Sequence, residues 1–344
     1  MSPIIRECER LDLDYFILHS GQHYSYEMDR IFFEQLGLVG AKYNLDVGSG
    51  SHGEQTGKML SGFEKILLKE EPDVVLVQGD TNSVLAGALA AAKLNIAVGH
   101  VEAGLRSYDR SMPEEINRIL ADHASDFLFA PTELSKKALL HEGIPEEKIF
   151  VTGNTVVDAV YQNLEISKGK SKILNELGLN VRDYFLVTIH RQENVDSQER
   201  LANIAKSLKC IKDLFGVDLI YPIHPRTRKC LKVFGISLDG VNCIEPLDYL
   251  SFLYLESNAC LVLTDSGGVQ EEACILNVPC VTLRDNTERP ETVDVGANVL
   301  AGTCPEDVLE KTKMMFNASS NWINPFGDGK AGQQIVEILR CKFD

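Results

Sequence analysis

The sequence predicts two α/β domains of similar size, each built on a doubly wound sheet of parallel strands. Short apolar runs rich in β-branched residues alternate with helix-like stretches along the chain, and this alternation is typical of parallel strands joined by crossover helices. A length of 344 residues suits two domains that each bury a core. A polar stretch at 165–172 separates the two series of elements.

The first domain contains five predicted strands and four predicted helices. The strands are Tyr15–Leu18, Val74–Val77, Ile96–Val101, Phe127–Ala130 and Ile149–Val151. The helices are Ser2–Leu11, Val84–Lys93, Glu114–His123 and Glu133–His141. A domain of this class usually opens with a buried strand and a glycine-rich turn. Here the series begins with a helix, so a first strand and its loop are missing from the pattern.

The second domain repeats the alternation. Its predicted strands are Tyr184–Ile189, Leu219–Ile223, Val241–Ile244, Cys260–Leu263 and Cys280–Leu283. Its predicted helices are Gln198–Phe215, Arg226–Phe234, Tyr249–Ser257 and Gly268–Leu276. We therefore expect domains at residues 1–165 and 166–322, and a loop and helix at 323–344 that could pack back on the first domain. Ligands bind beyond the carboxyl ends of such strands, so the expected site is an interdomain cleft.

Composition and missing motifs exclude several classes of function. A net charge of -16 argues against nucleic-acid and membrane-surface partners. No apolar run reaches the length of a membrane span, and the start is no signal peptide. Nine scattered cysteines predict reduced thiols in a cytoplasmic protein, and no Cys/His spacing predicts a metal site. The glycine motifs of nicotinamide-binding folds and P-loop ATPases are absent, so no cofactor is indicated.

The run Leu263–Glu272 has the pattern of a phosphate-binding corner. An apolar strand ends at Leu263, and a helix that Ser266 could cap starts near Gly268. Gly267 and Gly268 allow a phosphate to approach the main chain, where exposed amides and the helix dipole attract an anion. Glu271 or Glu272, about one turn into the helix, could accept hydrogen bonds from ribose hydroxyls. A capped helix start without a ligand is the alternative.

Three acidic residues follow or adjoin strand ends in the first domain, namely Asp80, Glu102 and Glu114. Carboxylates that converge raise one another's pKa, which suits acid–base chemistry at carbon. Two structural alternatives remain. Asp80 could cap the helix that follows it, and Glu114 could form an ordinary ion pair with Arg118, four residues later on one helix face.

Basic residues follow strands in the second domain. His190 and Arg191 could contact phosphate, although a single histidine after a strand is often a local hydrogen-bonding group. His224 has a comparable position after the next strand. Arg289 lies in a polar loop and could bind a phosphate through its planar guanidinium, or could be a solvated loop residue.

Together these runs resemble one family, the non-hydrolysing UDP-N-acetylglucosamine 2-epimerases. The matching runs are Gln78–Thr81, His100–Arg106, Pro113–Arg118, Thr152–Thr155, His190–Arg191, Thr264–Glu272, Thr287–Glu291 and Asn324–Gly329. They occur in the family's order and span nearly the whole chain. The resemblance implies two Rossmann-like domains of the glycosyltransferase B type, a homodimer, and no metal or nicotinamide.

The implied reaction interconverts UDP-GlcNAc and UDP-ManNAc. UDP is eliminated to leave 2-acetamidoglucal and is then added back with the opposite configuration at C2. By resemblance Asp80, Glu102 and Glu114 form the acid–base set, and His190 also belongs to the catalytic residues. The implied UDP-binding residues are Arg118, His190, Ser266, Gly267, Gly268, Glu272 and Arg289. Bacterial members also bind UDP-GlcNAc at an activating site, which Gln22, His23 and His224 resemble.

The main departure from the family lies at the start of the chain. Family members open with a strand, a Gly-Thr-Arg-Pro-Glu loop and a lysine, which precede the segment that matches Met1–Ile5. Their absence predicts exposed sheet edges and a poorly active, N-terminally incomplete chain. Three other functions remain open. They are a hydrolysing epimerase that releases ManNAc, a glycosyltransferase of the same fold, and a nucleotide-sugar-binding regulator without turnover.

Overall fold

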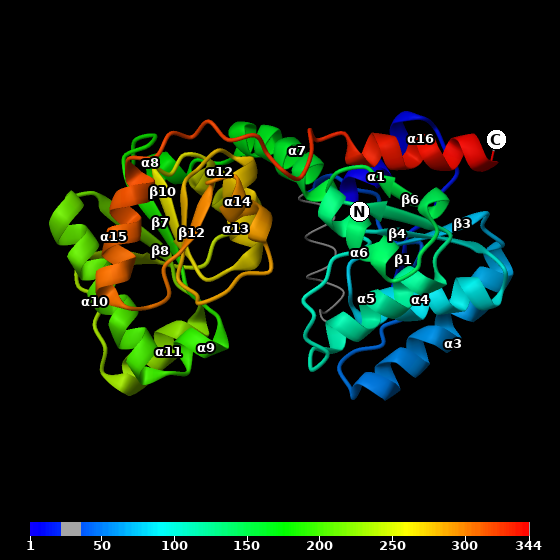
Figure 1. Ribbon diagram of the computed structural model, residues 1–344, viewed down its shortest axis with the longest axis horizontal. Helices are drawn as coiled ribbons and strands as arrows, with labels where there is room; N and C mark the ends of the chain where they lie inside the picture. Colours follow the sequence, from blue (N-terminus) through cyan, green and yellow to red (C-terminus); the bar gives the residue numbers. More distant parts are fainter. Residues whose placement is uncertain (22–35, 344) are drawn as a thin grey trace. The chain divides into compact units, whose positions relative to one another are not determined.

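The computed structural model describes residues 1–21 and 36–343 (Figure 1). The chain divides into two compact units. Unit 1 contains Met1–Ala159 and Phe326–Asp344, and unit 2 contains Val160–Pro325. The division falls inside helix α7 (Thr155–Lys170). The polar stretch at 165–172, which the sequence suggested as a break between domains, belongs to this helix as far as Lys170. Each unit has its own parallel sheet, so the predicted fold class is confirmed.

Unit 2 contains a sheet of six parallel strands. The strands are β7 (Tyr184–Thr188), β8 (Asp218–Pro222), β9 (Val241–Ile244), β10 (Leu261–Thr264), β11 (Cys280–Thr282) and β12 (Asn298–Leu300). Their spatial order is β12-β11-β10-β7-β8-β9, the doubly wound order of dinucleotide-binding folds. The winding reverses between β7 and β10, and a ligand site is expected at the carboxyl ends of these two strands.

Alternating side chains along β7 bury both faces of this sheet. Phe185 and Val187 enter one apolar cluster, whereas Tyr184 and Leu186 enter another. All five residues of β7 are buried, which fits a central strand of a parallel sheet. The helices of unit 2 are α8 (Ile173–Leu177), α9 (Gln192–Val195), α10 (Gln198–Phe215), α11 (Pro225–Phe234), α12 (Tyr249–Ser257), α13 (Gly267–Ile275), α14 (Pro290–Asp294) and α15 (Pro305–Phe316).

Unit 1 has its strands in two sheets. The larger contains β3 (Val74–Gln78), β4 (Ala97–Val101), β5 (Phe127–Ala130) and β6 (Ile149–Val151), in that order. The strands β1 (Leu18–His19) and β2 (Tyr43–Asn44) pair only with each other within the described part of the chain. β3 is therefore an edge strand there, with most of its residues only half-buried.

Helices cover both faces of the larger sheet of unit 1. They are α1 (Ser2–Arg10), α3 (His52–Glu70), α4 (Asn82–Lys93), α5 (Pro113–Ala124), α6 (Glu133–His141) and α16 (Ala331–Phe343). Met59 of α3, Ala88 of α4 and Val98 of β4 share one core cluster. Ile4 of α1, Phe129 of β5 and Ile335 of α16 share another. The last helix of the chain therefore packs against the first helix and the sheet, where Figure 1 also shows it beside α1.

The runs Thr152–Thr155 and Asn324–Gly329 explain how the C-terminal tail is held in unit 1. Gly153 has a positive φ of 81°, and a side chain at this position would lie 3.0 Å from the carbonyl oxygen of Phe326. This close approach lets the amide of Asn154 donate to the same oxygen at 2.8 Å. Asp158 is buried and accepts hydrogen bonds from the amides of Ala331 (3.2 Å) and Gly332 (2.8 Å) at the start of α16.

All nine cysteines are free thiols. In residues 1–21 and 36–343, no helix combines the length and apolar character needed to cross a membrane.

The tail contact leads to a stability prediction. Asp158→Ala removes the acceptor for two helix-end amides and should lower the free energy of unfolding by about 1–3 kcal/mol. Amide exchange in α16 should accelerate, as measured by hydrogen exchange. Asp328→Ala is the matched control, because its ion pair with Lys330 is largely exposed and contributes about 0–1 kcal/mol. Equal exchange rates in α16 for both variants would contradict the assignment.

Candidate functional site

The ends of β7 and β10 are held together by the carboxylate of Asp265. Asp265 is fully buried directly after β10, and its oxygens accept hydrogen bonds from the amides of His190 (3.0 and 3.1 Å) and Arg191 (3.0 Å). The side-chain amide of Asn194 donates to it at 3.1 Å. These donors are on the segment that follows β7. The contact therefore fixes both turns at the point where the winding of the sheet reverses.

Helix α13 begins at this edge of the sheet. Ser266 occupies the N-cap position, but its side chain makes no capping hydrogen bond, so the predicted side-chain cap is absent. The Ser266 amide donates instead to the Thr264 hydroxyl at 2.9 Å. Gly267 and Gly268 form the first turn, where main-chain amides and the helix dipole favour an anion. The predicted phosphate corner thus has the required local structure.

Charged side chains surround the start of α13. A side chain at Gly267 would lie 3.7 Å from the Arg191 guanidinium and 3.6 Å from the Glu288 carboxylate. Arg284 is buried and binds both Glu288 oxygens at 2.7 and 2.9 Å. This pairing lowers the pKa of Glu288 to about 2. His190 is about half exposed and its Nδ1 is 3.4 Å from Asp265, so its ring can contact a bound anion.

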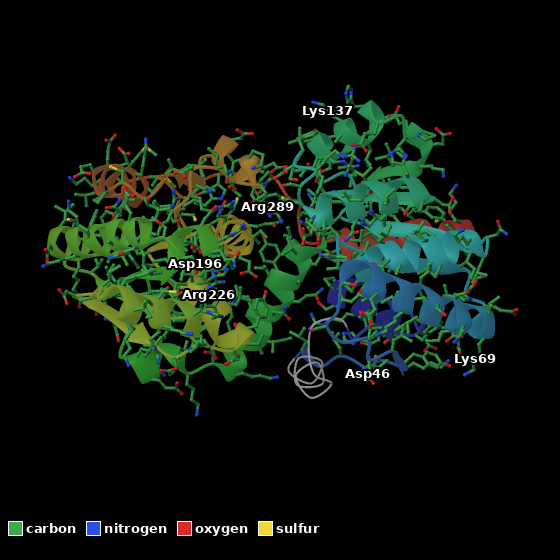
Figure 2. The ribbon with its side chains drawn as sticks, turned by 90° about the horizontal axis from the view of Figure 1, so that it is seen from below. Asp46, Lys69, Lys137, Asp196, Arg226 and Arg289 are labelled. Atoms are coloured by element: carbon green, nitrogen blue, oxygen red, sulfur yellow. The ribbon has the colours of Figure 1, made fainter. Side chains whose placement is uncertain are left out.

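The two glutamates of the run have different partners. Glu271 accepts a hydrogen bond from Arg289 at 2.9 Å, so Arg289 (Figure 2) is a paired residue rather than a solvated one. Glu272 accepts from the Tyr249 hydroxyl at 3.0 Å. Burial raises the pKa of Glu272, and the Tyr249 hydrogen bond lowers it only in part. Of the two, Glu272 retains the acceptor capacity that a ribose diol would use.

In unit 1, Asp80 lies on the turn that follows β3. Gly79 has a positive φ of 86°, which suits glycine and turns the chain sharply before Asp80. The Asp80 carboxylate pairs with Arg118 of α5, and its carbonyl accepts from the side-chain amide of Asn117 at 2.9 Å. The alternative role as a helix cap is wrong, because Thr81 occupies the N-cap position of α4.

The structural alternative for Glu114, an ion pair with Arg118, is also wrong. Arg118 binds Glu115, three residues earlier, at 2.9 Å, and Glu114 is exposed in the first turn of α5. Glu115 is buried because it also accepts from the amides of Ser107 (3.0 Å) and Tyr108 (2.9 Å). Glu115 therefore has a structural role, and the catalytic role of Glu114 stays a prediction.

Glu102 follows β4, the neighbour of β3 in the sheet. Its φ of 69° is unusual for a residue with a side chain, and such strain is often found at functional sites. The Gln78 side-chain amide donates to Glu102 at 2.6 Å and to the Thr155 hydroxyl at 3.1 Å. Gln78, at the end of β3, thereby links the two strand ends that carry Asp80 and Glu102.

A buried histidine that was not singled out from the sequence supports this edge. His100 Nδ1 contacts Asp122 at 2.6 Å and its Nε2 contacts the Gly79 carbonyl at 2.8 Å. Both partners are acceptors, so both ring nitrogens donate and His100 is an imidazolium. Burial lowers the pKa of His100, but the hydrogen bond and charge of Asp122, together with the Gly79 carbonyl and the Glu102 charge, outweigh burial and leave the pKa raised. The cation holds the turn that presents Asp80.

Of the residues predicted for an activating site, the structure describes only His224. His224 is exposed at the N-cap of α11, where its Nδ1 accepts from the Arg226 amide at 3.2 Å. Arg226 pairs in turn with Asp196, and Figure 2 labels both. Gln22 and His23 lie outside the described residues.

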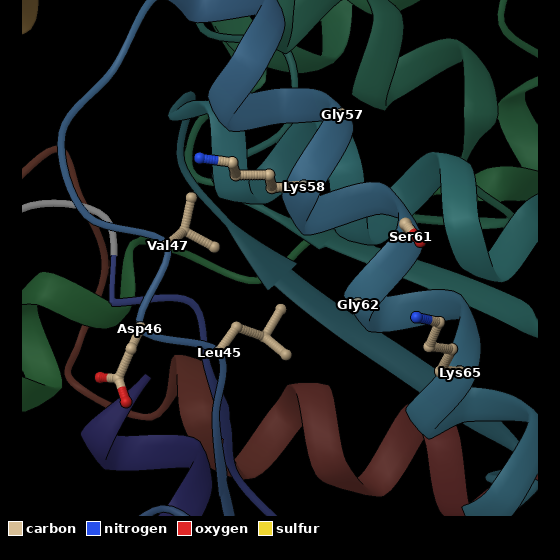
Figure 3. Close-up of a pocket in the computed structure, with 8 residues that line it drawn as sticks. All are labelled: Leu45, Asp46, Val47, Gly57, Lys58, Ser61, Gly62 and Lys65. Carbon is tan, nitrogen blue, oxygen red and sulfur yellow. The ribbon is translucent and has the colours of Figure 1, made fainter.

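A hollow of about 610 Å³ opens elsewhere on unit 1 (Figure 3). It is lined by Leu45, Asp46, Val47, Gly57, Lys58, Ser61, Gly62 and Lys65. None of the predicted site residues is among them, and Lys58 is already paired with Glu54 at 2.7 Å. The strand ends, rather than this hollow, therefore carry the candidate chemistry. In the described part of both units, no cluster of three histidine, cysteine or acidic residues has the arrangement of a metal site.

Comparison with known proteins identifies one family. The family model described as UDP-N-acetylglucosamine 2-epimerase matches residues 6–340. A UDP-N-acetylglucosamine 2-epimerase of Methanocaldococcus jannaschii is 59% identical over 347 aligned positions, which cover 98% of this chain and 94% of that protein. Its crystal structure in complex with UDP-GlcNAc and UDP has a TM-score of 0.86 and covers 99% of this chain and 95% of that one. A UDP-2,3-diacetamido-2,3-dideoxy-D-glucuronate 2-epimerase of Pseudomonas aeruginosa is 42% identical over 96% of this chain and 92% of its own.

The charge on His100 leads to a pH prediction. Because its folded pKa is raised, its contribution to stability is complete below the unfolded pKa of about 6.5 and is lost as the pH rises through the folded value. His100→Gln should lower the free energy of unfolding by about 2–4 kcal/mol at pH 6 and by less at pH 9. Urea unfolding followed by circular dichroism measures both.

His123→Gln is the control for this variant. His123 lies next to Asp122 but is about half exposed and 3.8 Å from Glu142. Its replacement should change stability by no more than about 0.5 kcal/mol at either pH. A loss at His100 that is the same at pH 6 and pH 9 would show that the ring is uncharged.

Proposed function

Because the chain belongs to the UDP-N-acetylglucosamine 2-epimerase family, we propose that it interconverts UDP-GlcNAc and UDP-ManNAc by inverting C2. The observation that carries the proposal is the anion corner at the switch point of unit 2, in the family run from Thr264 to Glu272. The sugar assignment rests on 59% identity to the archaeal UDP-GlcNAc epimerase, against 42% to the epimerase of a diacetamido uronate.

In this proposal unit 2 holds UDP. The amides at Gly267 and Gly268 bind the diphosphate together with the side chains of His190 and Arg289. Glu272 accepts hydrogen bonds from the ribose hydroxyls. Arg191 adds positive charge beside Gly267. An overall charge of -16 makes such local cations necessary for a ligand that is itself an anion.

The residues of unit 1 carry the proton transfers. A carboxylate removes the proton from C2 while the C1–O bond breaks. UDP is the leaving group, and the sugar becomes 2-acetamidoglucal. UDP then adds back to C1, and C2 receives a proton on the opposite face. Inversion uses an acid and a base on different faces of the sugar, so more than one carboxylate is needed. Asp80, Glu102 and Glu114 are assigned to these roles, with Arg118 as the cation that orients Asp80.

Proton NMR in heavy water tests the function. Incubation with UDP-GlcNAc should place deuterium at C2 of both UDP-HexNAc epimers, because each turnover breaks the C2–H bond. Release of free ManNAc with UDP would identify the hydrolysing reaction instead. A complete absence of deuterium at C2 would leave only a glycosyltransferase or a binding protein and would overturn the proposal.

Asp80→Asn provides a sharper prediction. The amide cannot accept the C2 proton, so C2 exchange should fall by about 10²-fold or more, while UDP-GlcNAc still binds. Calorimetry measures binding and NMR measures exchange. Asp73→Asn is the matched control, because Asp73 is exposed at the opposite end of the same strand and should leave both unchanged. Exchange at the native rate in Asp80→Asn would remove Asp80 from the catalytic set.

We further propose that the chain forms a homodimer. Ile116 and Leu120 lie one turn apart on α5 and are 40% and 45% exposed, so this helix presents an apolar surface to solvent. Such a surface suits a two-fold interface between copies of the chain. Sedimentation should give about twice the chain mass of 38.1 kDa, and Leu120→Glu should reduce it. A native mass of one chain would contradict the proposal.

The cytoplasm is the compartment that we propose. Exposed Cys243, Cys304 and Cys341 support it, because free surface thiols persist best where the environment is reducing. Recovery of the native protein with the periplasmic or extracellular fraction would refute this assignment.

A further inference from the structure

A second acidic side chain is in contact with Glu272 in the interior of unit 2. Glu256, on the neighbouring helix α12, is fully buried. Its carboxyl group lies against that of Glu272, which acts on it as a neighbouring negative charge. Within the described residues, no N–H group and no hydroxyl reaches either oxygen of Glu256. The polar group beside this fully buried carboxyl is therefore another carboxyl.

A fully buried carboxylate without a donor is very costly, and two ionised carboxylates cannot hydrogen-bond each other, because each is an acceptor without a proton to donate. One member of the pair is therefore protonated. Glu256 has no donor, and helices α12 and α13 and strand β11 contribute Leu255, Ala273 and Cys280 to one apolar cluster. Glu272 accepts from Tyr249 at 3.0 Å, which stabilises its ionised form. These partners place the proton on Glu256.

We propose that Glu256 is a positioning residue whose protonated carboxyl donates to Glu272 and orients the Glu272 carboxylate toward the ribose hydroxyls of UDP. This inference rests on the proposed role of Glu272 as ribose acceptor. Glu256 itself, being fully buried, makes no contact with the substrate. Its effect should therefore be on substrate binding and its pH dependence, and not on the proton transfers at C2.

Among the ionisable groups in this part of unit 2, the Glu256–Glu272 pair is the one that titrates nearest neutral pH. Tyr249 from α12 and Cys280 from β11 stay neutral, because burial raises the pKa of both. Glu271 from α13 is held by Arg289. Burial also raises the pKa of Glu256 and Glu272. As the pH rises, loss of the shared proton puts two like charges in contact and should displace Glu272 from its binding orientation.

The test measures KM for UDP-GlcNAc from pH 6 to pH 9, because this ligand has no phosphate group that titrates in that range. In the native protein KM should rise by about tenfold as the pair loses its proton, with kcat much less affected. In Glu256→Gln the amide still donates to Glu272 but cannot titrate. Its KM should stay within about threefold of the native value at pH 6 and should rise much less with pH.

Two further variants separate positioning from general packing. Glu256→Met removes the donor and should raise KM about tenfold at pH 6 with little change in kcat. Tyr249→Phe removes the hydroxyl donor to Glu272, so it should raise KM throughout, and the rise of KM with pH should remain but move to higher pH. Circular dichroism and melting temperature establish that each variant is folded. A native pH profile in Glu256→Gln, or a native KM in Glu256→Met, would overturn the inference.

Stability provides a readout that does not depend on turnover. Above the ordinary pKa of glutamate, the folded chain keeps a proton that the unfolded chain loses, so the free energy of unfolding falls as the pH rises toward the pKa of the folded pair. Glu256→Gln should lack this part of the fall. If that difference appears without any epimerisation, the proposed function fails and the shared proton stands. If epimerisation occurs but the free energy of unfolding depends on pH equally in the native protein and in Glu256→Gln, the shared proton is refuted and the proposed function stands.

Discussion

The buried carboxylate of Asp265 is the contact on which the ligand-facing edge of unit 2 depends. A carboxylate without donors is very costly to bury, and Asp265 meets this requirement with the amides of His190 and Arg191 and the side chain of Asn194. Because Asp265 follows β10 and its donors follow β7, these hydrogen bonds fix the distance between the two central strand ends. The first turn of α13 then has a fixed direction, while the His190 ring and the Arg191 guanidinium remain available to a ligand.

Unit 1 applies the same principle with a buried cation. His100 is held between Asp122 and the Gly79 carbonyl, and Asn117 holds the next carbonyl along the chain. The turn before α4 is thus restrained from two sides, while the Asp80 side chain remains partly exposed. In both units a fully buried charged group fixes the main chain, and a neighbouring, more accessible side chain is left for chemistry. Such pre-organisation lowers the cost of arranging catalytic groups when substrate binds.

The sequence was sufficient for the elements with strong local patterns and for the site residues carried by long motifs. Strands such as Phe127–Ala130 and Val241–Ile244 were predicted at their observed bounds because their apolar runs are flanked by polar turns. Helix α3 was missed, since its glycines at 53, 57 and 62 weaken the helical pattern. Strand β12 was missed because only three residues between two glycine-containing turns form it.

Contacts between distant residues explain the remaining differences at the site. Adjacent glutamates at 114 and 115 offered Arg118 two partners, and the amides of Ser107 and Tyr108 decide in favour of Glu115. His100 and Asp122 are 22 residues apart, so their pairing has no local signature. Ser266 has the identity of a capping residue, but the Thr264 hydroxyl determines the geometry at its amide. Motifs therefore locate the site, and tertiary hydrogen bonds decide which of its acids are structural.

The same reasoning distinguishes acids that complete the fold from acids that await a ligand. Asp265 and Glu115 have several strong donors each, so their lone pairs are used within the protein. Glu272 has one hydroxyl donor and one carboxyl partner, which leaves acceptor capacity on a half-buried carboxylate. A ribose offers two adjacent hydroxyl donors, which are what this carboxylate lacks. A nucleotide bound there would satisfy Glu272 as fully as the main chain satisfies Asp265, so the corner should keep UDP in place during the interval when its bond to the sugar is broken.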